Sequence, residues 1–144
     1  MLRLVDVTPD NWLCPLAVAP EQKEFVAHRV LLLARAYAYR ADRSHAVFLV
    51  EGKTGVGMAL WRDCGQENAY ILDDLFIDAR YQGQGYGTAA LALILEGFRR
   101  EGKFPRVILC YVEGNDAARK FYERSGFRRN FHDFEDEIEM ELTL

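Results

Sequence analysis

Cysteine is scarce in this chain, with three residues among 144. Cys14, Cys64 and Cys110 lie far apart and are odd in number, so they do not resemble the framework of a disulfide-stabilised domain. We interpret all three as small apolar residues that are buried in the core. His28, His45 and His132 are scattered in the same way, so no metal site is expected.

Long apolar runs are also missing, since no stretch of about 18 apolar residues occurs and a membrane-spanning helix is therefore not expected. The N-terminal residues MLRLVDVTPD carry Arg3 and Asp6 within their apolar stretch, which is unlike a secretory signal. We therefore expect a cytoplasmic protein with no membrane partner.

Positive charge is in deficit, because the formal net charge is -4. This balance disfavours long-range attraction to the phosphates of nucleic acid and suits a cationic partner better. Half of the residues are hydrophobic and 28% are charged, as in ordinary globular proteins. A chain of this length fits one hydrophobic core, so we expect a single domain over residues 1–144.

Apolar spacing predicts alternating strands and helices in the order β-α-β-β-β-α-β-α-β-β. The expected strands are residues 2–7, 45–51, 55–62, 70–78, 107–112, 126–131 and 137–144, and the expected helices are 20–39, from the glycine cluster at 83–87 to about 102, and 115–124. A helical turn is expected after Thr8. Helix 20–39 would present an apolar stripe of Phe25, Val26, Val30, Leu33 and Tyr37. The fold class is α/β (α+β), with a mixed sheet of about seven strands.

A glycine-rich turn, RYQGQGYGT, runs from Arg80 to Thr88 between a predicted strand and a predicted helix. Its glycines allow close approach to the backbone, and the amides at the start of the helix favour an anion such as a pyrophosphate. The lysine of a Walker loop is missing, and Gly-x-Gly-x-Gly is not the dinucleotide-binding spacing. Nucleotide hydrolysis and dinucleotide binding therefore lose support.

The segment from Gln82 to Gly87 resembles the Gln/Arg-x-x-Gly-x-Gly/Ala signature of the GCN5-related N-acetyltransferase (GNAT) superfamily. A second signature of that family, Asn-x-x-Ala-x-x-Phe-Tyr-x-x-x-Gly-Phe, is matched by Asn115, Ala118, Phe121, Tyr122, Gly126 and Phe127. The resemblance implies the GNAT fold, in which helices flank a mixed sheet and acetyl-CoA enters between splayed central strands. It also implies acetyl-CoA as co-substrate and a homodimer.

A closer likeness, to spermidine/spermine N-acetyltransferases of the BltD-like type, concerns residues 22–27, the segment YILDDLFI at 70–77, residues 80–87 and the tail at 135–140. It implies acetyl transfer to a primary amine of a small cationic acceptor, such as spermidine or spermine. A protein amine or an aminoglycoside is an alternative acceptor. A non-catalytic module that senses acyl-CoA is the alternative of another class.

Acetyl transfer needs a neutral amine, yet an alkyl ammonium with a pKa near 10.4 is neutral at pH 7 in only about one molecule in 2,500. The resemblance assigns the required base to Asp73, acting directly or through a water molecule. Asp74 is the alternative, since neighbouring strand residues face opposite sides and a bulge would exchange them. Tyr122 is the expected proton donor to the leaving thiolate. Structural roles for these side chains stay open as alternatives.

The resemblance also assigns the residues that hold the cofactor. Leu75, Phe76 and Ile77 would offer backbone groups to the pantetheine arm, with an oxyanion donor near Leu75. Asn115 would cap its helix or bond the same arm. The full expected cofactor set is Leu75, Phe76, Ile77, Gln82, Gly83, Gln84, Gly85, Tyr86, Gly87, Thr88, Asn115, Ala118 and Tyr122. The acidic residues Asp133, Glu135 and Asp136 either join the acceptor pocket or form a solvated turn.

Overall fold

The computed structural model describes residues 1–17, 19–23 and 29–144. Seven strands form one sheet in the order β1-β2-β3-β4-β5-β7-β6. The strands are β1 (Leu2–Asp6), β2 (His45–Glu51), β3 (Thr54–Cys64), β4 (Ala69–Ile77), β5 (Arg106–Val112), β6 (Arg128–Arg129) and β7 (Glu137–Thr143). Strands β4 and β5 pair in parallel, and the other recorded pairs are antiparallel. The predicted mixed sheet of about seven strands is confirmed.

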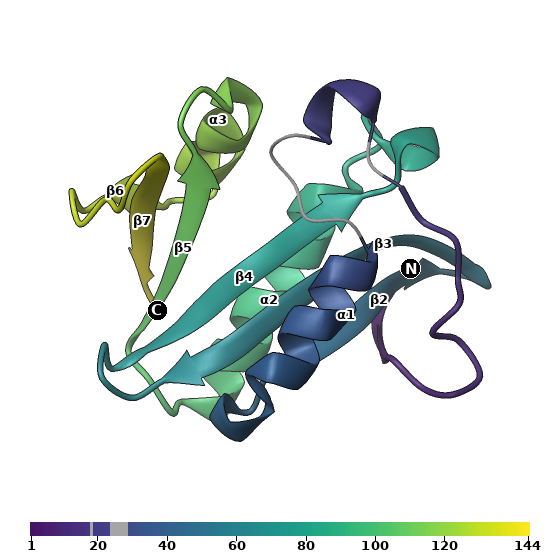
Figure 1. Ribbon diagram of the computed structural model, residues 1–144, viewed down its shortest axis with the longest axis horizontal. Helices are drawn as coiled ribbons and strands as arrows, with labels where there is room; N and C mark the ends of the chain where they lie inside the picture. Colours follow the sequence, from purple (N-terminus) through teal and green to yellow (C-terminus); the bar gives the residue numbers. More distant parts are fainter. Residues whose placement is uncertain (18, 24–28) are drawn as a thin grey trace.

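Helices cover both faces of the sheet. The α-helices are α1 (Arg29–Ala38), α2 (Tyr86–Glu101) and α3 (Asp116–Arg124), and the short 3-10 helices are η1 (Pro20–Gln22), η2 (Arg40–Asp42) and η3 (Ala79–Tyr81). Helix α1 lies on one face of strands β2 to β4 and α2 on the other, while α3 stands beside β5 (Figure 1). Within the described ranges, no helix is both long and apolar enough to cross a membrane.

Two hydrophobic clusters hold these layers together. The larger one, on the α2 side, contains Ile94 and the stacked rings of Tyr70 and Phe98, whose centroids are 4.0 Å apart. The smaller one, on the α1 side, contains Leu32 and Phe76. Burial of apolar area on both faces therefore fixes the sheet between the helices.

The structure corrects the prediction for the first helix. Residues 24–28, which include Phe25, Val26 and His28, lie outside the described residues. Val30 and Tyr37 are 57% and 68% exposed, whereas Leu32 is fully buried. The predicted apolar stripe is therefore wrong for Val30 and Tyr37, because the side of α1 that carries Leu32 contacts the sheet.

Two further expectations change. Cys110 is exposed and Cys14 and Cys64 are half-buried, so the prediction of three buried cysteines is wrong. The strand expected at residues 126–131 is reduced to the two residues of β6. The helical turn expected after Thr8 is confirmed, since the Thr8 carbonyl accepts from the amides of Asn11 and Trp12.

Gly57 permits a close contact between β3 and β4. A Cβ atom at this position would lie 2.2 Å from the backbone carbonyl oxygen of Phe76. We predict that Gly57→Ala lowers the free energy of unfolding by about 1–3 kcal/mol or more, because the clash is with backbone that cannot rotate away. Chemical denaturation measures the change. Gly97→Ala, where a Cβ would meet nothing within 4 Å, should stabilise slightly, since alanine favours the helix; equal effects of the two changes would contradict the prediction.

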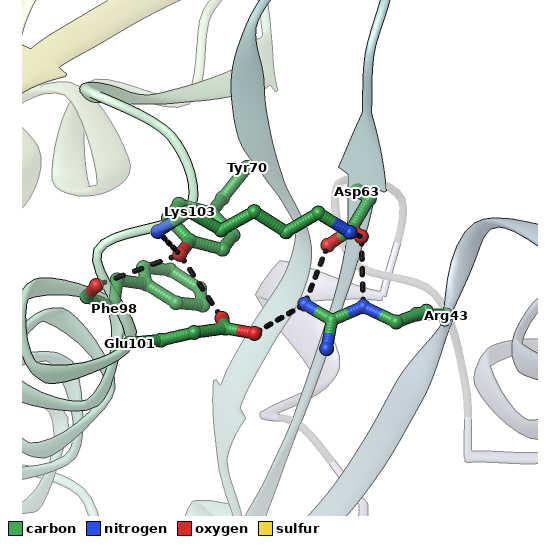
Figure 2. Close-up of polar contacts among 6 residues, drawn as sticks. All are labelled: Arg43, Asp63, Tyr70, Phe98, Glu101 and Lys103. Atoms are coloured by element: carbon green, nitrogen blue, oxygen red, sulfur yellow. Dashed lines mark hydrogen bonds and ion pairs between the residues drawn. The ribbon is translucent and has the colours of Figure 1, made fainter.

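A polar network joins the end of α2 to β3 and to the residues that precede β2 (Figure 2). The Arg43 guanidinium bonds both carboxylate oxygens of Asp63, at 2.8 and 3.1 Å, and Glu101 at 2.6 Å. Lys103 Nζ lies 2.6 Å from Asp63, and the Tyr70 hydroxyl donates to Glu101 at 3.0 Å. Burial alone would raise the pKa of Asp63, but the hydrogen bonds from Arg43 and Lys103 bring it below its usual value.

We predict that Asp63→Asn lowers the free energy of unfolding by about 1–2 kcal/mol at pH 7, because its charge-assisted hydrogen bonds are lost while the basic partners are partly exposed. A carboxyl group whose pKa is depressed in the folded state stabilises above its unfolded pKa, about 3.9, and loses that effect as the pH falls through the folded pKa. The difference in the free energy of unfolding between wild type and Asp63→Asn should therefore become smaller below about pH 4. Denaturation across pH tests this, with the exposed Glu96→Gln as control; a difference that grows in acid would refute it.

Candidate active site

The site lies where β4 and β5 separate. Their parallel pairing covers only residues 70–72 of β4 and 107–109 of β5. Beyond these pairs β5 diverges from β4 toward α3 (Figure 1). A pocket of about 360 Å³ lies among the end of β4, the glycine-rich turn and α3. The edge of β4 that faces β5 is therefore unpaired from residue 73 onward.

The pocket gathers the cofactor residues expected from the sequence. Every member of that set lines it except Gln84, which is exposed outside the pocket. The structure adds Gln22, Tyr81, Ala117, Phe121 and Arg124 to the lining, of which only Phe121 belonged to a sequence signature. The two signatures, far apart in the chain, thus meet at one cavity.

The start of α2 offers donors to this pocket. Gly85 is the N-cap, with a φ of 82° and no side-chain capping bond. The first amides of a helix have no partner within it. Gly83 also has a positive φ, of 76°, and a Cβ at either glycine would meet nothing within 4 Å. The turn is thus open to a ligand and fits a pyrophosphate, as the helix dipole also favours.

A bulge in β4 places two carboxylates on one side of the sheet. In the register with β3, Leu60 faces Asp74 and Trp61 faces Leu72, so Asp73 is an extra residue. Such a bulge interrupts the alternation of side chains. Arg62 Nε donates to Asp73 Oδ2 at 2.9 Å, and Arg35 Nη1, from α1, lies 3.6 Å from Asp74 Oδ2.

The two carboxylates differ in their hydrogen bonds. The Asp74 side chain is 8% exposed, and its Oδ2 accepts no hydrogen bond from the described residues. Burial raises the pKa of Asp74 to about 7, with Arg35 opposing the change and Asp73 adding to it. Burial also raises the pKa of Asp73, against the opposing charge and hydrogen bond of Arg62. A buried carboxylate with a free lone pair and a pKa near neutrality is suited to be a general base.

Tyr122 lies in the pocket wall, on α3. Burial raises the pKa of its hydroxyl, and the charge of Asp74 adds to the effect. The group therefore keeps its proton at neutral pH, as a proton donor must. Asn115 caps α3, since its Oδ1 accepts from the Ala118 amide at 3.2 Å. This structural role exists whether or not Asn115 also binds a ligand.

Asp73 and Asp74 directly precede Leu75 on β4 but are not among the residues that line the pocket. The other acidic candidates lie farther along the chain. Asp133, Glu135 and Asp136 do not line the pocket, and Asp133 pairs with Arg129 in the turn before β7. The side chains of the described ranges include no cluster of histidine, cysteine and acidic residues that could hold a metal ion.

Comparison with known proteins gives one family. The model of the acetyltransferase (GNAT) family matches residues 5–127. A spermine/spermidine N(1)-acetyltransferase of Bacillus subtilis (strain 168) is 39% identical over 59 residues, which are 41% of this chain. The match spans only 39% of that relative's own length.

Solved structures share the fold along the whole chain. An acetyltransferase from Thermus thermophilus has a TM-score of 0.81 at 19% identity, covering 99% of this chain and 97% of that one. The PaiA N-acetyltransferase from Thermoplasma acidophilum, in complex with coenzyme A, has a TM-score of 0.77 at 14% identity, covering 100% and 99%.

We predict that the Asp74 carboxyl titrates near pH 7 in the folded protein, because burial disfavours its charged form. Carbon-13 NMR of the side-chain carboxyls measures this directly, with Asp74→Asn for assignment. In Arg35→Gln the titration should move toward higher pH, since a stabilising positive charge is removed. Asp133, whose pKa the Arg129 hydrogen bond lowers, is the internal control. A titration of Asp74 near pH 4 would contradict the prediction.

Proposed function

The chain belongs to the acetyltransferase (GNAT) family, whose co-substrate is acetyl-CoA, and from that premise we propose that it acetylates a primary amine of a small cationic acceptor, such as spermidine or spermine. The observation that carries the proposal is the buried Asp74 carboxylate, whose Oδ2 accepts no hydrogen bond from the described residues and has only the Arg35 guanidinium, at 3.6 Å, as a charged neighbour. Its charge also contributes to the raised pKa of the Tyr122 hydroxyl. The Bacillus relative, named for spermine and spermidine, supports this acceptor class. A homodimer and a cytoplasmic location complete the proposal.

We assign the base to Asp74 rather than to Asp73. Asp73 accepts a hydrogen bond from Arg62 at 2.9 Å, whereas Oδ2 of Asp74 is free of hydrogen bonds within the described part of the chain. A pKa of about 7 makes Asp74 an effective proton acceptor at neutral pH without full protonation. The contact with Arg35 at 3.6 Å helps to keep the carboxylate charged.

The reaction then balances with two protein groups. The neutral amine nitrogen bonds to the carbonyl carbon of the thioester, the carbon–sulfur bond breaks, and the products are an acetamide and CoA. Asp74 first takes the proton that makes the bound ammonium neutral, directly or through a water molecule, and passes it to solvent; after the attack Asp74 takes the second nitrogen proton, and Tyr122 gives a proton to the sulfur. Both residues regain their starting states by exchange with solvent. Backbone amides near Leu75 are the candidates for stabilising the developing negative oxygen.

We predict the highest kcat/KM with spermidine or spermine in a panel that also contains an aminoglycoside and a peptide with a free N-terminus. Release of CoA thiol from acetyl-CoA is the measurement. The kcat/KM should fall as the pH drops below about 7, because Asp74 becomes protonated. Acetylation of the peptide alone, or tight CoA binding without turnover of any amine, would overturn the polyamine proposal.

The same assay examines the residue roles. Asp74→Asn should lower kcat by about 10²–10⁴-fold and Tyr122→Phe by a similar or smaller factor, since each removes a proton-transfer group. Glu96→Gln, an exposed carboxylate on α2, is the matched control and should retain wild-type activity. An active Asp74→Asn enzyme would remove Asp74 from the mechanism while leaving the acceptor class standing.

A further inference from the structure

A segment near the N-terminus is tied to the cofactor turn. We call residues 15–17 and 19–22 the strap. The Ala17 amide donates to Asp78 Oδ2 at 2.9 Å, and Arg80 Nη2 donates to the Pro15 carbonyl at 3.2 Å. Asp78 is 3% exposed, and the hydrogen bonds from Arg80 lower its pKa. The strap is therefore held at one end by a charged carboxylate with strong hydrogen bonds.

Its other end reaches the pocket through Gln22. Gln82 Nε2 donates to Gln22 Oε1 at 2.8 Å and to the Ile77 carbonyl at 2.9 Å. These two bonds use both amide hydrogens of Gln82. The family signature assigns Gln82 to the cofactor, but both of its side-chain N–H groups donate to other protein groups, one on the strap and one at the end of β4.

Gln22 keeps its own donors available. It lines the same pocket as Gln82 and Tyr86, and no hydrogen bond among the described residues uses Gln22 Nε2. The carboxamide is held in place by its oxygen, so its amide hydrogens are presented with little further loss of side-chain freedom. Coenzyme A offers the complementary groups, since its pantetheine carbonyls and its phosphates are hydrogen-bond acceptors.

We propose that Gln22 is a cofactor-binding residue: Gln82 fixes its carboxamide oxygen, and Gln22 Nε2 donates to an acceptor oxygen of acetyl-CoA in the pocket. The inference rests on the proposed function, because it takes acetyl-CoA as the ligand. No family signature contains Gln22, which precedes Gln82 by 60 positions. Cofactor binding would then also hold the strap against the pocket.

Calorimetric titration with CoA separates a donor role from a purely structural one. Gln22→Ala removes both functions and should raise the Kd about 3- to 10-fold, the effect of one lost hydrogen bond. Gln22→Glu keeps an oxygen for Gln82 but has no amide hydrogens, and its charge repels phosphates. It should therefore bind CoA at least as weakly as Gln22→Ala. Gln66→Ala, an exposed glutamine in the turn between β3 and β4, should bind like wild type.

Hydrogen exchange gives a second readout that does not depend on activity. CoA should protect the amides of Ala19, Glu21 and residue 22 in wild type and protect them less in both Gln22 variants. A Gln22→Glu protein that binds CoA like wild type, or unchanged exchange in the strap, would overturn the inference. If wild type itself fails to bind CoA, the proposed function falls as well, whereas normal CoA binding by both variants removes the Gln22 role alone.

Discussion

The early end of pairing between β4 and β5 is the feature on which the site depends. Beyond Leu72 and Leu109, each strand keeps its other neighbour, since β4 stays paired with β3 and β5 with β7. The separation therefore costs only the few hydrogen bonds between two interior strands. It leaves backbone groups of residues 75–77 without a strand partner on the β5 side; the Ile77 carbonyl accepts from Gln82 instead, and the other groups need another partner. An extended, amide-bearing ligand arm is a natural one.

The bulge lies directly after the last paired residue of β4. Asp73 is the extra residue in the register with β3, so Asp73 and Asp74 both contact arginines on the α1 side. The arginines offset the negative charges of the two carboxylates unequally. Arg62 Nε lies 2.9 Å from Asp73 Oδ2, whereas Arg35 Nη1 lies 3.6 Å from Asp74 Oδ2. The less compensated carboxylate is the one whose charge reaches Tyr122. The bulge and the end of the parallel pairing thus lie next to each other on β4, which places the proposed base beside the opening.

The features that sequence predicted are the local ones. Glycine spacing and the start of α2 lie within one short segment, and their chemistry follows from backbone rules. Strand periodicity identified β4 but carries no sign of a bulge, which depends on the register with β3. Which face of α1 packs on the sheet depends on tertiary contacts that the sequence pattern does not show. Leu32 is therefore buried against the sheet, whereas the predicted Val30 and Tyr37 are exposed. Residues 22–27 entered the closer resemblance, but no local pattern assigned Gln22 to the cofactor, because its partner Gln82 becomes a neighbour only through the fold.

The charge around Asp73 and Asp74 bears on the acceptor proposed for this enzyme. Arg35 and Arg62 offset the two carboxylates, so the pair alone attracts a cation weakly. Further negative charge comes from β7, where Glu137 adds to the raised pKa of Asp73. Glu137 and Glu139 alternate with the buried Ile138 and Met140, so both point away from the core beneath α2. An acceptor with one ammonium near Asp74 and a second toward β7 would meet both sources of charge, whereas a monoamine would meet only one.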